Sequence, residues 1–313
     1  MARRKNRTAR ESAPKALIRA FGTVMLAVLL FAVYFKMADA NPLPQPYSQA
    51  DASEAQASAT KLYFIDVGQG DAMLICQNGR YALIDAGTKS SEANIIKTLD
   101  ALNVQTLDYL IMTHPHADHI GGMRAVVENY AVQKMILPDF EKFEYPTTST
   151  FLKLMQAVQQ KQIPTETALT GTEYPLGEGK ITIVGDGIIS PDYNNISITT
   201  RFTGGGLTYL STGDAELEAE EALLASGQPL QADLFKAGHH GSSTSNSRAF
   251  LNKVRPKAVF IGCGKDNEYG HPHKEVESAF RQMGAVVYRT DHNGTIFAYV
   301  AADGSVKLQA EKI

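Results

Sequence analysis

The 313-residue sequence predicts an α/β (α+β) fold in which two mixed β-sheets pack face to face and carry helices on their outer faces. Its composition is that of a globular protein, since 44% of the residues are apolar and 20% are charged. Hairpin patterns alternate with helical patterns in two successive halves of the chain, which favours sheets enclosed between helices. The sequence contains no repeat of about 20–50 residues, and this excludes a solenoid or a propeller.

The first half of the predicted domain, which begins near Lys61, alternates strands with helices. Asn78-Gly79 is a two-residue hairpin turn between two predicted strands. Ile95, Leu99 and Leu102 have the spacing of one helix face. The predicted strands are 61–67, 71–77, 80–86, 107–113 and 132–137, and the predicted helices are 91–102, 123–130 and 148–162.

The second half repeats this alternation and ends in a hairpin. Three glycines at 204–206 separate two predicted strands, and Asp303-Gly304 turns the last hairpin. The predicted strands are 181–184, 196–202, 207–211, 232–237, 258–262, 285–288, 295–300 and 306–310, and the predicted helices are 216–225, 246–254 and 274–283.

Residues 1–40 are predicted to be a signal peptide or a membrane anchor. Seven basic residues precede an uncharged run at 20–35, and Ala38-Asp39-Ala40 offers a small-x-small cleavage site. The run is slightly short for an uncleaved span, so both cleavage and anchoring stay open. Because the basic residues precede the run, we expect the remainder outside the cytoplasm, secreted or anchored to the cell membrane by this segment.

Residues 41–60 are rich in Pro, Ala, Ser and Gln and lack periodicity, which predicts a flexible linker to a domain at 61–313. Residues 1–60 carry a net charge of +4, and the total of −3 leaves −7 for the domain. This acidic balance argues against binding nucleic acid through phosphate contacts alone. Two cysteines, Cys76 and Cys263, are too few for a disulfide framework or a Cys-rich zinc site.

Histidines gather in three short clusters, which hold seven of the eight in the chain. Each cluster lies in a predicted loop after a strand, where ligands for a divalent metal would stand on a rigid frame. The clusters are His114, His116 and His119, with Asp118 between them; His239 and His240; and His271 and His273.

The spacing of the first cluster indicates two metal ions. His114 and His116 can point to one ion, whereas the adjacent Asp118 and His119 can point to a second. Asp214 follows a predicted strand, and with a metal cluster present we interpret it as the carboxylate that bridges the ions. Asp85 ends another strand and is expected to orient the histidine loop. One of His239 and His240 is expected to complete the second site, and the residues alone leave open which one.

These residues match a known pattern. HPHADH at 114–119, with an aspartate before it and an aspartate and a histidine after it, resembles the metallo-β-lactamase superfamily. FIDVGQGDAMLI (64–75), KAGHHGSSTS (236–245) and YGHPHKEV (269–276) resemble, in order, the metallohydrolase domain of ComEC-type competence proteins and their stand-alone relatives. The resemblance implies a four-layer αββα sandwich of the metallo-β-lactamase type over 61–313, a dinuclear metal site and hydrolysis of phosphodiesters or nucleic acid.

The sequence departs from the superfamily pattern in one ligand. No histidine occurs from 120 to 238, where many members have one before the bridging aspartate. The ComEC-like group has an Asn/Ser-containing motif in this region, and Asn194 to Ser197 match it loosely, so the first ion would be held by His114 and His116 with an Asn oxygen or His271. This weaker nitrogen shell favours manganese as much as zinc and argues against β-lactamase activity.

The functional hypothesis is an extracytoplasmic dinuclear-metal hydrolase that attacks its substrate with a metal-bridging hydroxide. Asp118, Asp214 and His271 are the expected catalytic residues, of which His271 could ligate an ion or give a proton to the leaving group. Ser242 and nearby backbone amides are expected to bind a phosphate. Asn195 and His273 are further candidates for supporting the ligands or contacting substrate.

A short or single-stranded oligonucleotide, or another phosphodiester, is the expected substrate, since two bound cations offset the acidic domain. A cell-envelope ester or lactone hydrolase with the same metal site is the first alternative. A catalytically silent metal-binding module is the second. The oligomeric state is not determined by the sequence.

Overall fold

The computed structural model describes residues 49–141 and 144–312. The predicted signal peptide or anchor at 1–40 therefore lies outside the described residues. Within the described part of the chain, no helix is both long and apolar enough to cross a membrane.

The N-terminal end of the described chain is a helix, α2 (Gln49–Ala57). The sequence predicts a flexible linker over 41–60, so that prediction is wrong for this segment. Ala55 is buried against Tyr299 and Ala301 of the last hairpin, and the Ala302 amide donates to Glu54 Oε1 over 3.1 Å. The helix depends on these long-range contacts, which local periodicity does not report.

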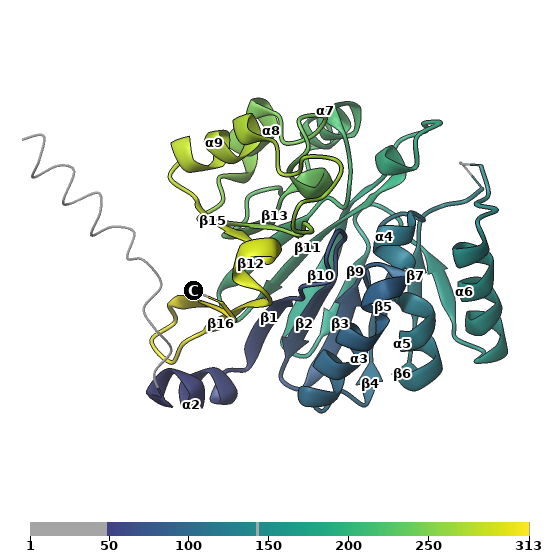
Figure 1. Ribbon diagram of the computed structural model, residues 1–313, viewed down its shortest axis with the longest axis horizontal. Helices are drawn as coiled ribbons and strands as arrows, with labels where there is room; N and C mark the ends of the chain where they lie inside the picture. The colour runs from purple at the N-terminus through teal and green to yellow at the C-terminus, as the bar shows by residue number, and fades with distance from the viewer. Residues whose placement is uncertain (1–48, 142–143, 313) are drawn as a thin grey trace, which may run out of the picture. The chain divides into compact units, whose positions relative to one another are not determined.

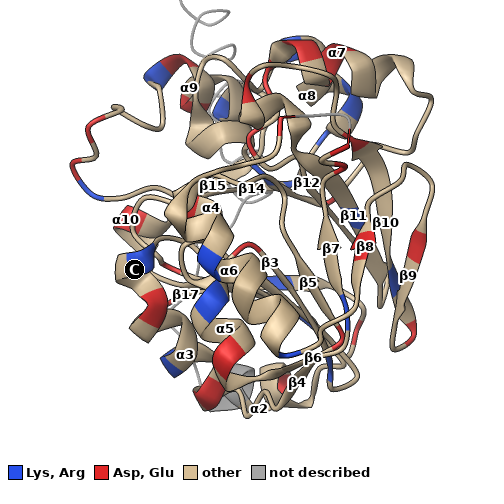
Figure 2. Ribbon diagram, turned by 90° about the vertical axis from the view of Figure 1, so that its right-hand side faces the viewer, with Lys and Arg blue, Asp and Glu red and all other residues tan. Residues whose placement is uncertain are grey.

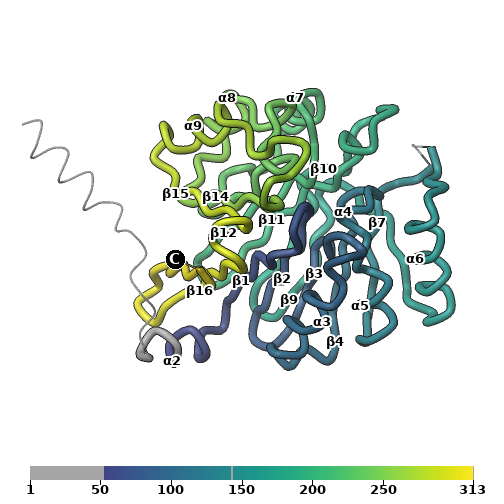
Figure 3. Tube along the Cα trace, viewed as in Figure 1, coloured from purple at the N-terminus to yellow at the C-terminus, as the bar shows by residue number. Residues whose placement is uncertain are grey.

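The first sheet has eight strands, in the order β17-β16-β1-β2-β3-β5-β7-β8. β3, β5, β7 and β8 run parallel, and the remaining neighbours are antiparallel. The C-terminal hairpin returns to pair with β1, so both ends of the described chain lie at one side of this sheet (Figure 3). The strands are β1 (Thr60–Phe64), β2 (Met73–Gln77), β3 (Arg80–Ile84), β5 (Tyr109–Ile111), β7 (Met135–Leu137), β8 (Thr165–Thr167), β16 (Ile296–Val300) and β17 (Val306–Ala310).

The second sheet has seven strands, in the order β15-β14-β13-β12-β11-β10-β9. β12 to β15 run parallel, and β9 to β12 are antiparallel. The strands are β9 (Glu173–Leu176), β10 (Gly179–Asp186), β11 (Ile198–Gly204), β12 (Leu207–Ser211), β13 (Leu234–Lys236), β14 (Ala258–Ile261) and β15 (Val286–Arg289), and two short strands, β4 (Thr106–Leu107) and β6 (Ala131–Val132), pair separately.

Helices cover the outer faces of both sheets (Figures 1 and 2). α3 (Glu92–Ala101), α5 (Met123–Asn129) and α6 (Ser149–Gln160) lie on the first sheet. α7 (Leu217–Ala225), α8 (Arg248–Val254) and α9 (Lys274–Gln282) lie on the second. The remaining helical turns are α4 (Ala117–Ile120), α10 (Thr290–Asn293), η1 (Lys89–Ser91), η2 (Tyr193–Ile196) and η3 (Gly238–Gly241).

Three buried apolar layers separate the four structural layers. The inner layer lies between the sheets and includes Leu62, Phe202 and Phe260. A second layer packs the first sheet against its helices through residues such as Leu99 and Phe151, and a third does the same for the second sheet. The arrangement confirms the predicted αββα sandwich.

The parallel strands place their carboxyl ends at one edge of each sheet. β3 and β5 end before Asp85 and the 114–119 loop, and β12 and β13 end before Asp214 and the His239-His240 pair. Parallel strands end on the same side, so these loops meet where the two sheets face each other.

The inner layer makes a testable contribution to stability. Phe260 stacks on Phe64, with ring centroids 3.5 Å apart, and on Tyr288 at 5.8 Å. We expect Phe260→Ala to lower the free energy of unfolding by about 3–5 kcal/mol, through lost burial and a residual cavity. Urea denaturation would measure the change, with Leu152→Ala on α6, 47% exposed, as a control that changes little. A loss below about 1 kcal/mol would contradict the packing described here.

Candidate metal centre

Asp214 follows β12 at the junction of the sheets, and four imidazoles converge on its Oδ2 atom. The carboxylate is 2% exposed. The distances from Oδ2 to the imidazole Nε2 atoms are 3.1 Å for His119, 3.3 Å for His240, 3.9 Å for His114 and 3.9 Å for His239. A buried oxygen among several nitrogens is the geometry in which a carboxylate and imidazoles share a divalent cation.

The loop after β5 brings the first cluster to this centre. His114 is fully buried, and its Nε2 lies 3.1 Å from Nδ1 of His116. His116 begins the short helix α4, which carries Asp118 and His119 on its first turn. Asp118 Oδ2 lies 3.9 Å from His119 Nε2 and 3.2 Å from His240 Nε2.

Asp85 fixes the orientation of His119. Its Oδ2 lies 2.8 Å from Nδ1 of His119, and because a carboxylate only accepts, Nδ1 carries the proton. Thr113 donates its backbone N–H and its hydroxyl to the same carboxylate, over 2.9 and 2.6 Å. With Nδ1 held in this way, Nε2 faces Asp214, as a metal ligand requires.

His239 and His240 both reach the centre from η3. Each has a left-handed backbone, with φ of 48° and 54°, and two such residues in succession turn both rings toward Asp214. Nδ1 of His240 donates to the carbonyl of Gly262 over 2.8 Å. Nδ1 of His239 lies 3.3 Å from Glu216 Oε1. Sequence reasoning expected one of the two histidines here, and the structure places both.

The charges of the centre compensate one another. Burial alone raises the pKa of the Asp214 carboxyl, but His119, His240 and Lys236 outweigh burial and hold that pKa well below its usual range. Burial lowers the pKa of His240, but Asp214 and Asp71 overcome this effect and raise it to about 10. The same balance, led by Asp214, holds the pKa of His119 well above its usual value. Without metal, both imidazoles are therefore protonated at neutral pH.

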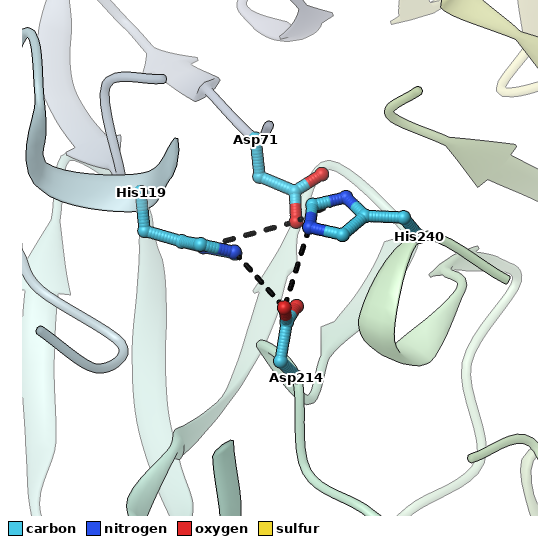
Figure 4. A group of neighbouring side chains, drawn as sticks. All are labelled: Asp71, His119, Asp214 and His240. Atoms are coloured by element: carbon cyan, nitrogen blue, oxygen red, sulfur yellow. Dashed lines mark hydrogen bonds and ion pairs between the residues drawn. The ribbon is translucent and has the colours of Figure 1, made fainter. Parts of the chain in front are cut away.

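Two residues of the centre, Asp71 and Lys236, were not predicted from the sequence. Asp71 precedes β2, and Lys236 ends β13; the Lys236 ammonium contacts the carboxylates of both Asp71 and Asp214. One ligand atom from each of Asp71, His119, Asp214 and His240 lies within 4.8 Å of the others (Figure 4). A lysine inside a strand predicted to be buried was the available signal for Lys236, since buried lysines need acidic partners.

A cavity of about 340 Å³ opens over the centre. Asp214 and the two histidines of η3 line it, together with Tyr269 and His271. The full set is Gln69, His116, Ala117, Asp118, Asn194, Asp214, His239, His240, Tyr269 and His271.

The predicted candidates for contacting substrate, Asn195, Ser242 and His273, do not line this cavity. Asn195 Oδ1 accepts from the backbone N–H two residues after Asp214, so it holds that segment, and its neighbour Asn194 lines the cavity instead. Ser242 is buried with its Oγ 3.1 Å from the Thr244 hydroxyl, and its expected contact with phosphate stays a prediction. Nδ1 of His273 accepts from the amide of residue 243 and ties the start of α9 to that loop.

His271 lies at the cavity wall beside the η3 histidines. Its ring centroid is 5.5 Å from that of His239 and 6.1 Å from that of His240. Burial, followed by the charges of these two rings, lowers the pKa of His271 to about 4. His271 is therefore a neutral imidazole at neutral pH, which is the form that ligates a cation and not the form that gives a proton to a leaving group.

The donor set fits a divalent metal. Buried imidazole nitrogens and carboxylate oxygens are the ligands of zinc and similar cations. His240 Nε2 is buried and lies 3.2 Å from Asp118 Oδ2 and 3.3 Å from Asp214 Oδ2, so one nitrogen and two carboxylate oxygens face a common point that a cation could occupy. The residues present would thus hold a metal without rearrangement of the fold.

An αββα sandwich with a His- and Asp-rich centre at the meeting edge of its sheets defines a metal-dependent hydrolase. Residues 65–265 match the family model described as the metallo-beta-lactamase superfamily, and the chain belongs to that superfamily. Tm1679, described as a metal-dependent hydrolase of the beta-lactamase superfamily, has the same fold: its TM-score is 0.50 at 11% identity, over 74% of this chain and 95% of that one.

Curated relatives confirm the resemblance to ComEC-type competence proteins. ComE operon protein 3 of Bacillus subtilis is 29% identical over 259 residues, which are 77% of this chain and 33% of the relative. Competence protein ComA of Neisseria gonorrhoeae is 29% identical over 79% of this chain and 33% of its own length. The chain thus spans about a third of the length of these relatives.

The role of Asp85 can be tested by metal affinity. We expect Asp85→Asn to weaken metal binding about 10–100-fold, because the amide holds the His119 ring less firmly than the carboxylate does. Competition with a chromophoric chelator would measure the change. Asp108→Asn is the matched control, since Asp108 also accepts a backbone N–H but lies at the other end of β5. Equal affinities for Asp85→Asn and the wild type would refute this role.

Proton release on metal binding follows from the raised pKa values of His119 and His240. A metal takes the place of a proton on each nitrogen that it binds, so loading at pH 7 should release about one to two protons per chain. The part of the release that comes from His240 should disappear as the pH rises through about 10, the pKa of that residue. Calorimetric titration in two buffers of different ionisation enthalpy would measure it, and a binding enthalpy independent of the buffer would count against the charge balance described above.

Proposed function

We propose that this chain is an extracytoplasmic hydrolase that holds two divalent ions, zinc or manganese, and cleaves phosphodiesters. The convergence of four imidazoles on one oxygen of Asp214 carries the proposal. A carboxylate that bridges two cations needs nitrogen ligands on more than one side, and Oδ2 of Asp214 has them.

One ion would be held by Asp118, His119 and His240 together with Asp214. These three side chains form a compact group, since Asp118 Oδ2 lies within 3.9 Å of the Nε2 atoms of both histidines. The outer ring nitrogens of His119 and His240 are already engaged by Asp85 and a backbone carbonyl. Both Nε2 atoms are therefore presented to the same point.

The other ion would be held by His114 and His116, again with Asp214. His239 is our candidate for the nitrogen that the stretch 120–238 lacks. Its Nε2 faces Asp214 Oδ2 at the same distance as that of His114, 3.9 Å. Its Nδ1 hydrogen-bonds to the Thr244 hydroxyl over 3.2 Å, and Glu216 Oε1 lies 3.3 Å away, so Nδ1 is engaged and Nε2 is left for a metal.

The cavity supplies the remaining requirements for hydrolysis. When bound, the ions supply Lewis-acid polarisation of the ester and a water of lowered pKa. Asp214 and Asp118, which line the cavity, would ligate the ions and fix their positions. His271, neutral at pH 7, lies in the cavity wall, where it could ligate an ion. The Tyr269 ring stacks on His271, is 58% exposed and offers a flat surface to a nucleobase.

A short or single-stranded nucleic acid, or another small phosphodiester, is the substrate that we propose. The domain at 61–313 is acidic, and on the face seen in Figure 2 basic and acidic segments are interspersed. Attraction for phosphate would therefore come from the bound ions rather than from a basic surface. The names of the relatives, which include competence proteins and Recombination protein 2, support this substrate class.

The location that we propose rests on the sequence of residues 1–40, which would direct the chain out of the cytoplasm as a signal peptide or engage the membrane as an anchor. Basic residues before the apolar run support this orientation.

The proposed activity can be tested on the full-length chain. We expect protein stripped of metal and reloaded with Mn²⁺ or Zn²⁺ to cleave a chromogenic phosphodiester and labelled single-stranded DNA. Asp214→Ala should reduce both rates to background because it removes the shared ligand. Asp303→Ala, in the turn between β16 and β17, should keep the wild-type rate.

Other outcomes would redirect the proposal. Two ions bound per chain without phosphodiester cleavage would favour the ester or lactone hydrolase. Bound metal without turnover of phosphodiesters, carboxylic esters or lactones would favour a silent metal-binding module. A wild-type chain that binds no metal would overturn the proposal.

A further inference from the structure

Lys236 carries its charge on the inner face of the second sheet. It is the last residue of β13 and 4% exposed. Its side chain points to the same face as that of Leu234, which belongs to the apolar layer between the sheets. A charged group in this layer is costly unless acceptors surround it.

Three acceptors surround the Lys236 ammonium. Its Nζ donates to the carbonyl of Gly213 over 2.9 Å and to Oδ1 of Asp214 over 3.2 Å. It forms an ion pair with Oδ2 of Asp71. An ammonium has three protons, so these contacts use its whole donor capacity. Oδ1 of Asp214 is thereby occupied, and Oδ2 alone faces the imidazoles.

Asp71 faces the Nδ1 atoms of His119 and His240, whereas a shared metal would lie at their Nε2 atoms. Its Oδ2 lies 3.9 Å from Nδ1 of His119 and 3.7 Å from Nδ1 of His240. These Nδ1 atoms already donate to Asp85 and to the Gly262 carbonyl, whereas the Nε2 atoms face Asp214. Nδ1 and Nε2 point in different directions from one ring, so a cation on the Nε2 atoms lies away from Asp71.

Close packing against Gly262 and a backbone hydrogen bond fix the position of Asp71. A Cβ atom on Gly262 would lie 2.3 Å from Oδ1 of Asp71, so only glycine leaves room for it. The Asp71 amide donates to the carbonyl of Asp118 over 3.2 Å, which ties the β1–β2 loop to the ligand loop. Asp71 is therefore held as the counter-ion of Lys236.

We propose that Lys236 is a positioning residue: with Asp71 as its counter-ion, it holds Asp214 by Oδ1 and leaves Oδ2 to the metal ions, while Asp71 binds no metal. The occupied Oδ1 prevents Asp214 from closing both oxygens around one ion. We call the ion pair of Lys236 and Asp71 the clamp. The charge of Asp71 offsets that of Lys236, so the clamp adds no net positive charge that would repel cations. The inference rests on the proposed function in one respect, that Asp214 is shared by two ions.

A double-mutant cycle on the metal-free, full-length protein tests the ion pair. Lys236→Met leaves two neighbouring carboxylates uncompensated, so its melting temperature should fall. Asp71→Asn in the same chain removes one of them, so the double variant should melt higher than Lys236→Met alone. Strictly additive changes, or a failure of the second substitution to restore stability, would overturn the pairing.

Metal titration tests the positioning role. The double variant has the net charge of the wild type but lacks the clamp; we expect it to keep two ions per chain and to bind them about 10–100-fold more weakly. Asp71→Asn alone should also keep two ions. Loss of one ion in Asp71→Asn would show that Asp71 is a ligand, and wild-type affinity in the double variant would show that the clamp positions nothing. Either result overturns the proposal.

An exposed pair provides the matched control. Lys180 and Glu173 form an ion pair across β9 and β10, with both side chains about half exposed. The cycle Lys180→Met and Glu173→Gln should show little coupling and leave metal affinity unchanged. A wild-type chain without bound metal would refute the proposed function and the positioning role together. Coupling in the metal-free melts would still establish the ion pair, which distinguishes the two failures.

Discussion

Buried negative charge at the edge where the two sheets meet is the constraint on which the rest of the centre depends. Asp71, Asp85 and Asp214 are all at least nine-tenths buried, and each has an oxygen within 3.9 Å of a ring nitrogen of His119. Carboxylates taken out of water must be compensated by cations or hydrogen bonds. In the metal-free protein, imidazoles and Lys236 supply this compensation. The same arrangement provides the ligands and the negative charge that divalent cations require.

The three aspartates have different roles because different atoms surround each carboxylate. Asp85 contacts the outer nitrogen of His119 and two donors of Thr113, so it orients a ring. Asp214 receives Lys236 on one oxygen and several imidazoles on the other, so it can be shared between ions. Asp71 meets Lys236 and the outer side of the imidazoles, so it balances charge. The division of roles follows from which atom faces which, and not from residue type.

Three residues of the centre have strained backbone conformations. Asp85, His239 and His240 all have positive φ values, of 56°, 48° and 54°. Such conformations are unfavourable for residues other than glycine, and they persist where the surrounding structure determines them. Asp85 directly follows β3, and the two histidines lie in the turn η3 that follows β13, so the rigid strands set the position of the ligand atoms. A cavity over a rigid, strained centre is the arrangement expected of a hydrolytic site.

The sequence by itself determined the αββα order of elements, the histidine loops at strand ends and the importance of Asp214, because periodicity and ligand spacing are local properties. Only the tertiary structure decided that both η3 histidines reach the centre, that Ser242 does not face the cavity, and that α2 forms. It also brought Lys236 to Asp71 across the two sheets. These outcomes depend on contacts between residues far apart in the chain, whose geometry is set by the packing of the two sheets.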